Sequence, residues 1–397
     1  MKRLAITALT ILLALSAGAW PRWIPHYDFA RFERNRIVFP AGESRDFALF
    51  LRKLDTLRVT GRGDVRILHV GGSHVQGGTW TDQLRQDFLS LGYGLDGGRG
   101  LVFPFSAAGT NTPVGYNSSF SGAWTSSRCL NPETVTGLTG MTVTAQDTSA
   151  RFIIDLAPRE KKQWIPRYTV RSVDVLGYGD MEPVLLLWGR DTLRGVPGRG
   201  LWHFDLPVYQ DRVELAFSLP SGRYTIKGLY LDRPGYGLTL SEAGVNGAST
   251  ASWLKCDDWE EDLRRVRPDL VIFSVGINDI QGRDFDAAAF KRNYGKLVKM
   301  VHKVNPRCAI LFTANNDSWK KGAPNPWTGD AEKAFEALAK QYKAAFWDLY
   351  DIMGGYGSME KWQEAGLAQG DKIHFTPEGY RLLGDLLFNA IMDCCDQ

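Results

Sequence analysis

The 397-residue sequence has no marked excess of charge of either sign, because 44 aspartates and glutamates balance 47 lysines and arginines. Proteins that bind the phosphates of nucleic acids carry a strongly basic face, so we expect no nucleic-acid partner. The one basic cluster, formed by Arg264, Arg265 and Arg267, is typical of a solvated helix end.

Histidine and cysteine are also scarce. The six histidines do not cluster, and the five cysteines show none of the spacings that bind zinc. The sequence therefore predicts no metal site. An odd number of cysteines cannot all pair, and the adjacent Cys394 and Cys395 are poor partners for each other, so no disulfide is assigned.

Long apolar runs are missing, with one exception at the amino terminus. Lys2 and Arg3 precede an apolar run over residues 4–15, and small residues follow it up to Ala19. This order is typical of a secretory signal peptide, and the run is short for a membrane span. We expect residues 1–19 to be a signal peptide. The mature protein would then act in the periplasm or outside the cell, without a stable membrane span.

Strand and helix patterns alternate in two parts of the chain. The expected strands are 65–70, 270–275, 309–312 and 345–349, and the expected helices are 80–91, 290–302, 331–342 and 377–392. Thr376 is a suitable N-cap for the last helix, with Pro377 at its first position. Strands that alternate with helices predict a parallel sheet covered by helices on both faces, which is a three-layer α/β/α fold.

The segment between these two parts has a different texture. Residues 105–238 contain short strand-like runs between glycine, proline and aspartate turns, and no helical pattern of useful length. This is typical of an inserted, jelly-roll-like β-sandwich. We therefore predict a discontinuous α/β domain over 61–104 and 239–397, the β-sandwich over 105–238, and an N-terminal extension over 20–60.

Ser73 follows the first expected strand and the glycines Gly71 and Gly72, and a helix pattern comes next. Parallel sheets place ligands at the carboxyl ends of their strands, where Ser73 is expected to lie. A serine hydroxyl becomes nucleophilic when a base takes its proton, and a carboxylate best orients a histidine base. Asp371 and His374, three positions apart before the last helix, fit those two roles.

Two further segments follow expected strands, namely 244–248, which contains Gly247, and 276–279, which contains Asn278. Attack on an ester creates an oxyanion that needs preorganised hydrogen-bond donors. A glycine N–H, the Asn278 amide and the Ser73 N–H are candidate donors. The alternative is purely structural, with Gly247 in a turn and Asn278 and Asp279 as a helix cap.

In this order, the segments 71–74, 244–247, 276–279 and 371–374 resemble the first, second, third and fifth sequence blocks of the SGNH (GDSL-like) hydrolase family. The resemblance implies a flavodoxin-like sheet and ester hydrolysis without a metal or other cofactor. It implies these roles: Ser73 as nucleophile, His374 as base, Asp371 as its partner, and Ser73, Gly247 and Asn278 as the oxyanion hole. One position departs from the pattern, because Gly72 stands where the family usually has aspartate.

A narrower resemblance covers most of the mature chain. The long insertion, the segment 98–101 and the segment 353–358 are similar to bacterial peptidoglycan O-acetylesterases, in which the inserted β-module resembles a carbohydrate-binding module. An O-acetylated polysaccharide, with peptidoglycan first, is the substrate that this resemblance implies. Residues 98–100 fit either a substrate-facing loop or a tight turn, whereas His74, Trp202 and His203 are expected to be structural.

Two other functions stay open from the sequence. The same triad serves a glycan O-acetyltransferase, because an acetyl-enzyme passes its acetyl group to water or to an alcohol. A non-catalytic glycan-binding protein on a decayed esterase scaffold is the second, and Gly72 is the clue that favours it. The sequence predicts no oligomeric state.

Overall fold

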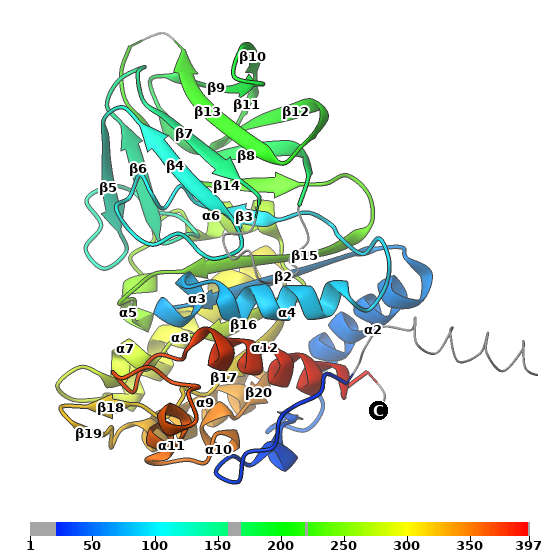
Figure 1. Cartoon of the computed structure of the whole chain (residues 1–397), viewed down its shortest axis with the longest axis vertical. Helices are drawn as coiled ribbons and strands as arrows, with labels where there is room; N and C mark the ends of the chain where they lie inside the picture. Colours follow the sequence, from blue (N-terminus) through cyan, green and yellow to red (C-terminus); the bar gives the residue numbers. More distant parts are fainter. Residues whose placement is uncertain (1–20, 158–167, 219–220, 396–397) are drawn as a thin grey trace, which may run out of the picture.

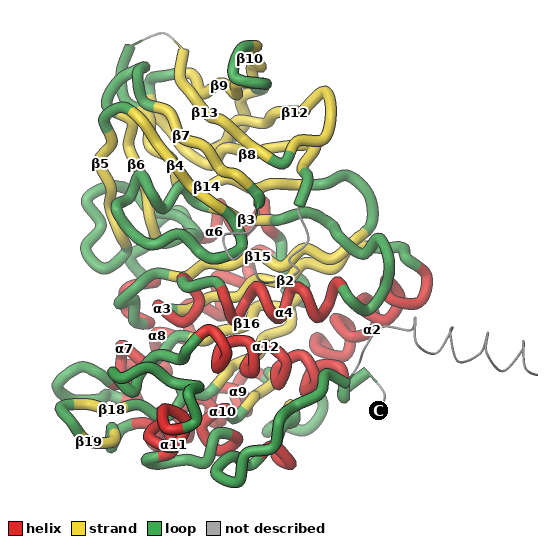
Figure 2. The backbone as a smooth tube through the Cα atoms, viewed as in Figure 1, coloured by secondary structure: helices red, strands yellow, loops and turns green. Residues whose placement is uncertain are grey.

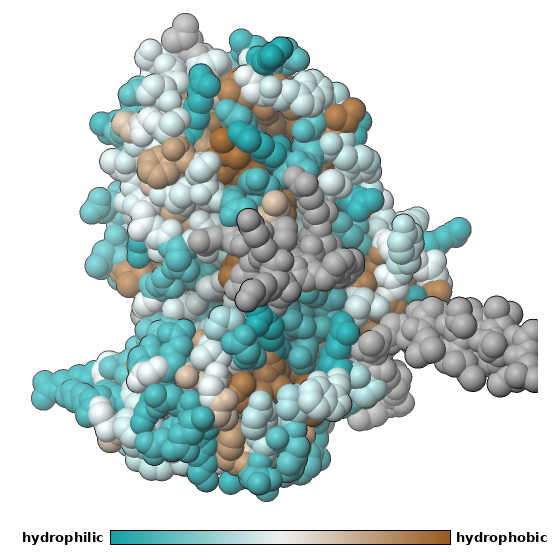
Figure 3. Space-filling model, viewed as in Figure 1, coloured by the Kyte–Doolittle hydropathy of each residue, from teal (hydrophilic) through white to brown (hydrophobic). Residues whose placement is uncertain are grey.

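The computed structural model describes residues 21–157, 168–218 and 221–395, and Figure 1 shows how its elements are arranged. The predicted signal peptide, 1–19, lies outside the described residues. Within the described part, no helix has both the length and the apolar character needed to cross a membrane. On the face shown in Figure 3, hydrophobic residues form several small patches in a mostly hydrophilic surface.

A six-stranded sheet forms the centre of the α/β domain. Its order is β1 (Ile37–Val38), β20 (Ala345–Trp347), β17 (Ala309–Thr313), β16 (Leu270–Ser274), β2 (Asp64–Gly71) and β15 (Gly237–Gly244). All neighbours are parallel except β1, which pairs with β20 in the antiparallel sense. Counted along the chain, the five parallel strands have the order 2-1-3-4-5 that defines the flavodoxin-like fold.

Helices cover both faces of this sheet because successive strand residues point to opposite sides. Ile67 packs into one hydrophobic cluster with α2 (Arg45–Thr60), α4 (Thr79–Leu89) and α12 (Pro377–Met392). Its neighbour Leu68 packs into a second cluster with α6 (Trp259–Val266), α8 (Ala287–Val304) and α9 (Thr328–Tyr342). The predicted three-layer α/β/α fold is confirmed.

Short helices connect these elements, namely η1 (Phe32–Arg34), α3 (Ser73–Gln76), α5 (Thr250–Trp253), α7 (Ile277–Ile280), α10 (Leu349–Ile352) and α11 (Ser358–Glu364). The predicted start of the last helix is confirmed. The Thr376 side chain accepts a hydrogen bond from the Gly379 N–H, and Pro377 is the first helical residue.

The β-module is a sandwich of two antiparallel sheets, which Figure 2 shows as the strand-rich part of the molecule. The first contains β10 (Asp191–Arg194), β9 (Glu182–Leu187), β13 (Arg212–Ser218), β7 (Arg151–Asp155) and β4 (Asn117–Ser121). The second contains β11 (Val196–Gly198), β12 (Leu201–Gln210), β8 (Val170–Gly179), β14 (Tyr224–Asp232), β6 (Met141–Ala145) and β5 (Trp124–Arg128), with β3 (Gly100–Val102) against β14. A small hairpin, β18 (Trp319–Lys320) and β19 (Ala323–Pro324), stands apart from both.

Sheet membership differs from the predicted ranges at two places. The first is β3, which pairs with β14 of the β-module although the prediction put residues 61–104 in the α/β domain. The second is the predicted extension 20–60, where β1 joins the edge of the central sheet and α2 packs against it. Short strands such as β1 bury little apolar surface, so their partners leave no pattern in the sequence.

Candidate active site

The candidate site lies at the carboxyl edge of the central sheet, where three neighbouring strands end together. Gly71 of β2 stands opposite Gly244 of β15 on one side and Ser274 of β16 on the other. The chain continues from these three ends into α3, the loop before α5, and α7, which Figure 1 shows on one side of the molecule. The three sequence segments predicted to meet do meet.

A chain of hydrogen bonds joins the three predicted triad residues. The Oγ atom of Ser73 lies 2.8 Å from Nε2 of His374, although the two residues are 301 positions apart. On the other side of the ring, Nδ1 of His374 lies 2.6 Å from Oδ2 of Asp371. The second carboxylate oxygen of Asp371 accepts hydrogen bonds from the Ile373 N–H at 2.9 Å and the His374 N–H at 3.0 Å.

The Asp371 carboxylate keeps its charge in this setting. Partial burial favours the neutral acid, but the His374 backbone N–H, the His374 ring and the Ile373 N–H together hold the pKa of Asp371 below its usual value. An ionised Asp371 bonded to Nδ1 keeps Nε2 free to accept the serine proton. The geometry therefore suits a serine activated by a histidine base.

The predicted oxyanion donors line one pocket of about 450 Å³ with Ser73 and His374. Within the described residues, the backbone N–H groups of Ser73 and Gly247 donate no hydrogen bond. The Asn278 amide donates one of its two hydrogens to the Ala248 carbonyl at 3.0 Å, which leaves the other available. Three unused donors on one pocket can hold a developing oxyanion.

Gly72 leaves room for the Asn278 amide. A Cβ atom at position 72 would lie 3.2 Å from Asn278 Nδ2 and 3.7 Å from the Ala248 oxygen, the two atoms that bond to each other. The φ of −95° at Gly72 lies outside the left-handed region that favours glycine. The departure from the family pattern therefore changes what surrounds Asn278, while Ser73 and His374 stay in contact.

Asp279 connects α7 to the start of α5. Its carboxylate accepts hydrogen bonds from the Thr250 hydroxyl at 2.6 Å and from the Thr250 N–H at 3.1 Å. Burial raises the pKa of Asp279 to about 6, against the effect of these hydrogen bonds. Asp279 thus fastens the loop that carries Gly247 to the segment that carries Asn278.

Lys372 holds the loop between Asp371 and His374. Its backbone has the left-handed φ of 53°, and its carbonyl accepts a hydrogen bond from the Trp319 N–H at 3.0 Å. The Lys372 Nζ atom lies 3.6 Å from the centre of the Trp319 ring and 2.8 Å from a Glu360 oxygen. The loop is therefore tied to β18 and to α11 at one residue.

His74, next to the serine, is structural as expected. It is buried, its Nδ1 atom lies 2.7 Å from the Tyr380 hydroxyl, and burial followed by the nearby His374 lowers its pKa to about 3. A neutral His74 supports the wall of the site without adding a charge.

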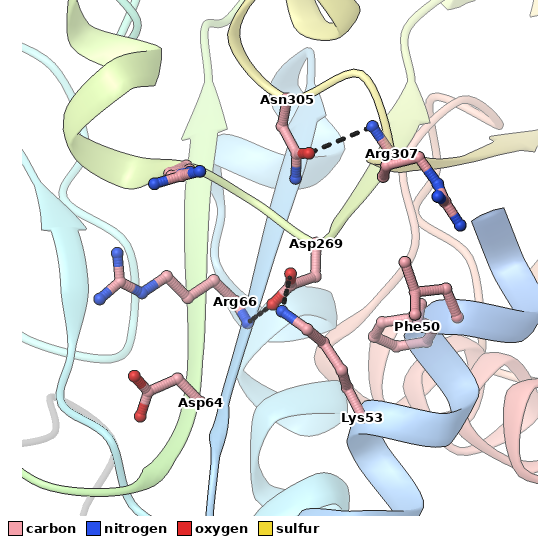
Figure 4. Close-up of a pocket in the computed structure, with 9 residues that line it drawn as sticks. Phe50, Lys53, Asp64, Arg66, Asp269, Asn305 and Arg307 are labelled. Atoms are coloured by element: carbon pink, nitrogen blue, oxygen red, sulfur yellow. Dashed lines mark hydrogen bonds and ion pairs between the residues drawn. The ribbon is translucent and has the colours of Figure 1, made fainter.

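Other segments singled out in the sequence do not line the site pocket. Residues 98–100 lead into β3 with φ of 113° at Gly98 and 75° at Gly100, and Arg99 is fully buried against Glu242 at 2.6 Å. His203 lies in the β-module, 2.6 Å from Asp174. A separate basic pocket of about 330 Å³ lies at the amino-terminal end of the strands, where Figure 4 shows Lys53 directed at Asp269. No predicted site residue lines it.

Sequence reasoning missed several residues that line or support the pocket: Gln76, Asn111, Asn246, Gln281, Gln369 and Tyr380. Gln76 could have been found from the sequence, because it lies three positions after Ser73, and a helix brings residues at that spacing close together. Tyr380 lies near the start of α12. The others come from loops, where polar residues are common and no periodicity marks a function.

The comparisons with known proteins cover different parts of the chain. Residues 227–382 match the model of the GDSL-like lipase/acylhydrolase family, a range that starts in β14 and leaves out Ser73. No curated protein matches the chain.

Among solved structures, a peptidoglycan O-acetylesterase is similar over 91% of this chain and 99% of its own, with a TM-score of 0.74 and 23% identity. At this identity the likeness shows the shared fold. A lipase/acylhydrolase from Enterococcus faecalis covers 40% of this chain and 77% of its own, with a TM-score of 0.31 and 22% identity. A family two carbohydrate esterase from Cellvibrio japonicus covers 70% and 99%, with a TM-score of 0.30 and 13% identity.

Proposed function

We propose, from the premise that residues 227–382 carry a GDSL-like lipase/acylhydrolase domain, that this chain is a serine esterase that removes O-acetyl groups from a polysaccharide. The observation that carries the proposal is the hydrogen-bonded chain from Ser73 through His374 to Asp371, which opens on the same pocket as three unused donors. Such an arrangement needs no metal ion or organic cofactor for acyl transfer.

The reaction follows from these positions in two steps. His374 Nε2 takes the Ser73 proton as Oγ attacks the acetyl carbonyl, and the oxyanion that forms binds the N–H groups of Ser73 and Gly247 and the Asn278 amide. The intermediate then collapses, and the C–O bond to the sugar breaks. The sugar oxygen takes the proton from His374. In the second step, His374 takes a proton from water as the water attacks the acetyl-Ser73 ester. The bond from the acetyl carbon to Ser73 Oγ then breaks, Oγ takes the proton back from His374, and acetate leaves.

The substrate is proposed to be O-acetylated peptidoglycan. The similarity of fold to a peptidoglycan O-acetylesterase extends over both the α/β domain and the β-module, which supports this substrate class. The pocket also presents polar side chains, Asn246, Gln281 and Gln369, that suit the hydroxyls and amides of a glycan. Export by the predicted signal peptide would bring the enzyme to this substrate in the periplasm or outside the cell.

Acetate release tests the substrate. Purified protein is incubated with O-acetylated peptidoglycan and, in parallel, with acetylated xylan, and Ser73→Ala is the matched control. We expect faster release from peptidoglycan and none above background from the variant. Faster release from xylan would refute the peptidoglycan assignment. Transfer of the acetyl group to an added glycan, without free acetate, would replace the hydrolase by a transferase.

A further inference from the structure

A buried amide links three segments around the candidate oxyanion hole. Gln76, at the end of α3, is 1% exposed, and its Oε1 atom accepts a hydrogen bond from the Asn246 N–H at 2.7 Å. Its Nε2 atom donates to the backbone oxygen of Asn111 at 3.1 Å and to the side-chain oxygen of Asn111 at 3.0 Å. Asn111 belongs to the loop between β3 and β4, two strands of the β-module.

The same Asn111 oxygen reaches the oxyanion segment directly. The Asn246 side chain donates to Asn111 Oδ1 at 2.7 Å, so that Asn111, Gln76 and Asn246 close a ring of hydrogen bonds. The orientation of the Gln76 amide is fixed, because the Asn246 N–H can only donate and the Asn111 carbonyl can only accept. Each polar atom of the Gln76 side chain therefore has one possible role.

This ring lies next to a residue that lines the pocket. Asn246 immediately precedes Gly247, which has a left-handed φ of 82° and lines the pocket with Ser73. Asp279 holds the following part of the segment through Thr250. With Gln76 and Asn111 on one side and Asp279 on the other, the position of the Gly247 N–H is fixed from both ends.

We propose that Gln76 and Asn111 are positioning residues of the oxyanion hole, so that a loop of the β-module contributes to catalysis. The inference rests on the proposed esterase function and goes beyond it, because neither residue belongs to the triad or donates to the oxyanion. Oxyanion stabilisation depends on donors that are preorganised at the right distance, so a loop that shifts loses rate while the substrate still binds.

The test compares isosteric and conservative variants on a chromogenic acetyl ester. Asn111→Leu removes the shared acceptor, whereas Asn111→Asp keeps Oδ1, the atom through which the ring is closed. Gln76→Glu keeps the acceptor for the Asn246 N–H but places a carboxylate oxygen against the Asn111 carbonyl. Gln146→Glu is the matched control, because Gln146 also donates two hydrogen bonds, to Thr125 and Thr144 inside the β-module.

We expect kcat to fall about tenfold in Asn111→Leu and more in Gln76→Glu, with KM within about threefold of wild type, because losing a whole oxyanion donor costs roughly 100-fold to 1,000-fold. Asn111→Asp should recover most of the loss, and Gln146→Glu should match wild type. Asn111 is exposed, so its variants are expected to fold, which a thermal melt checks.

Two results would overturn the inference while wild-type esterase activity stands. The first is an unchanged kcat in folded Asn111→Leu, and the second is an equal fall in Asn111→Asp and Asn111→Leu. A wild-type protein without any esterase activity would overturn the proposed function itself, and with it the role of these residues.

Discussion

Lys372 shows how one residue between two proposed catalytic groups can set their geometry. The left-handed backbone at Lys372 costs energy for a side chain with a Cβ atom, of the order of 1 kcal/mol or more. The contacts of its ammonium group with Trp319 and Glu360 offset that cost, and its side chain is 17% exposed. A loop strained in this way keeps its shape only while those contacts persist.

Replacing Lys372 with methionine should therefore make the loop that carries the His374 base more mobile, while His374 itself is kept. The cation–π contact and the ion pair are each worth about 1 kcal/mol, so we expect kcat on an acetyl ester to fall about threefold to tenfold, with little change in KM. Lys361→Met on the exposed side of α11 is the control. A folded Lys372→Met enzyme with wild-type kcat would show that the contacts do not position His374.

At this scale, residue type and spacing predicted the groups that meet at the site but not the side chains that support them. Ser73 and His374 carry chemistry that few residue types can supply, so their pattern is informative. Gln76 and Asn111 act through amide groups that occur in many loops. Their partners became visible only when the fold brought together residues that lie 35 to 170 positions apart in the chain.

Among the elements, the pair of α4 and α12 carries an unusual buried contact. Asp87 on α4 and Asp385 on α12 both lie beside Gln83, whose Nε2 atom donates to Asp87 at 3.1 Å and to Asp385 at 2.9 Å. Burial and then repulsion from Asp385 raise the pKa of Asp87 to about 8, although Arg22 acts in the opposite direction. The raised pKa favours the protonated form of Asp87 at neutral pH.

The sign of the resulting pH dependence follows from linkage. The folded-state pKa of Asp87 lies above the unfolded value of roughly 3.9, so the pair favours the folded state most at acid pH and less as the pH rises toward 8. Asp385→Asn keeps a hydrogen-bond donor for Asp87 without the repulsion. We expect it to raise the Tm by about 2 °C or more at pH 8.5 and by less at pH 5.

Thermal melts of Asp385→Asn at both pH values check this prediction, with Asp284→Asn as an exposed control (81% side-chain exposure). A larger gain at pH 5 than at pH 8.5 would contradict the assignment. The helices themselves were predictable, because α4 and α12 have apolar residues at helical spacing. The contact between Asp87 and Asp385 was not predictable, because the sequence does not show how two helices are aligned along each other.

At the scale of the whole molecule, charged residues join the β-module to the α/β domain. Lys227 of β14 lies 2.8 Å from Asp262 and 3.0 Å from Asp258 at α6. Arg265 of α6 pairs with Asp232 of β14 at 3.0 Å and with Asp174 of β8. The basic cluster at the end of α6 was predicted to be solvated, and for Arg265, which is 20% exposed, that prediction was wrong.

Ion pairs of this kind favour one relative orientation of two packed surfaces, because a shift would leave buried charges unpaired. The alternation of strands and helices was enough to predict the parallel sheet and its two covering layers. The loss of that alternation over 105–238 predicted the inserted β-sandwich. These patterns were not enough to predict how the β-module docks, since docking combines a shared hydrophobic cluster with long-range charge pairs. The contact of Asn111 with the oxyanion segment follows from that docking.

The most direct test of the account is to trap the covalent intermediate. The protein is mixed with an acetyl ester, quenched in acid during turnover, digested and analysed by mass spectrometry. The account predicts one acetyl group on the peptide that contains Ser73, and none on the same peptide from Ser73→Ala, which should also lose turnover. Acetylation at another residue, or wild-type turnover by Ser73→Ala, would contradict it.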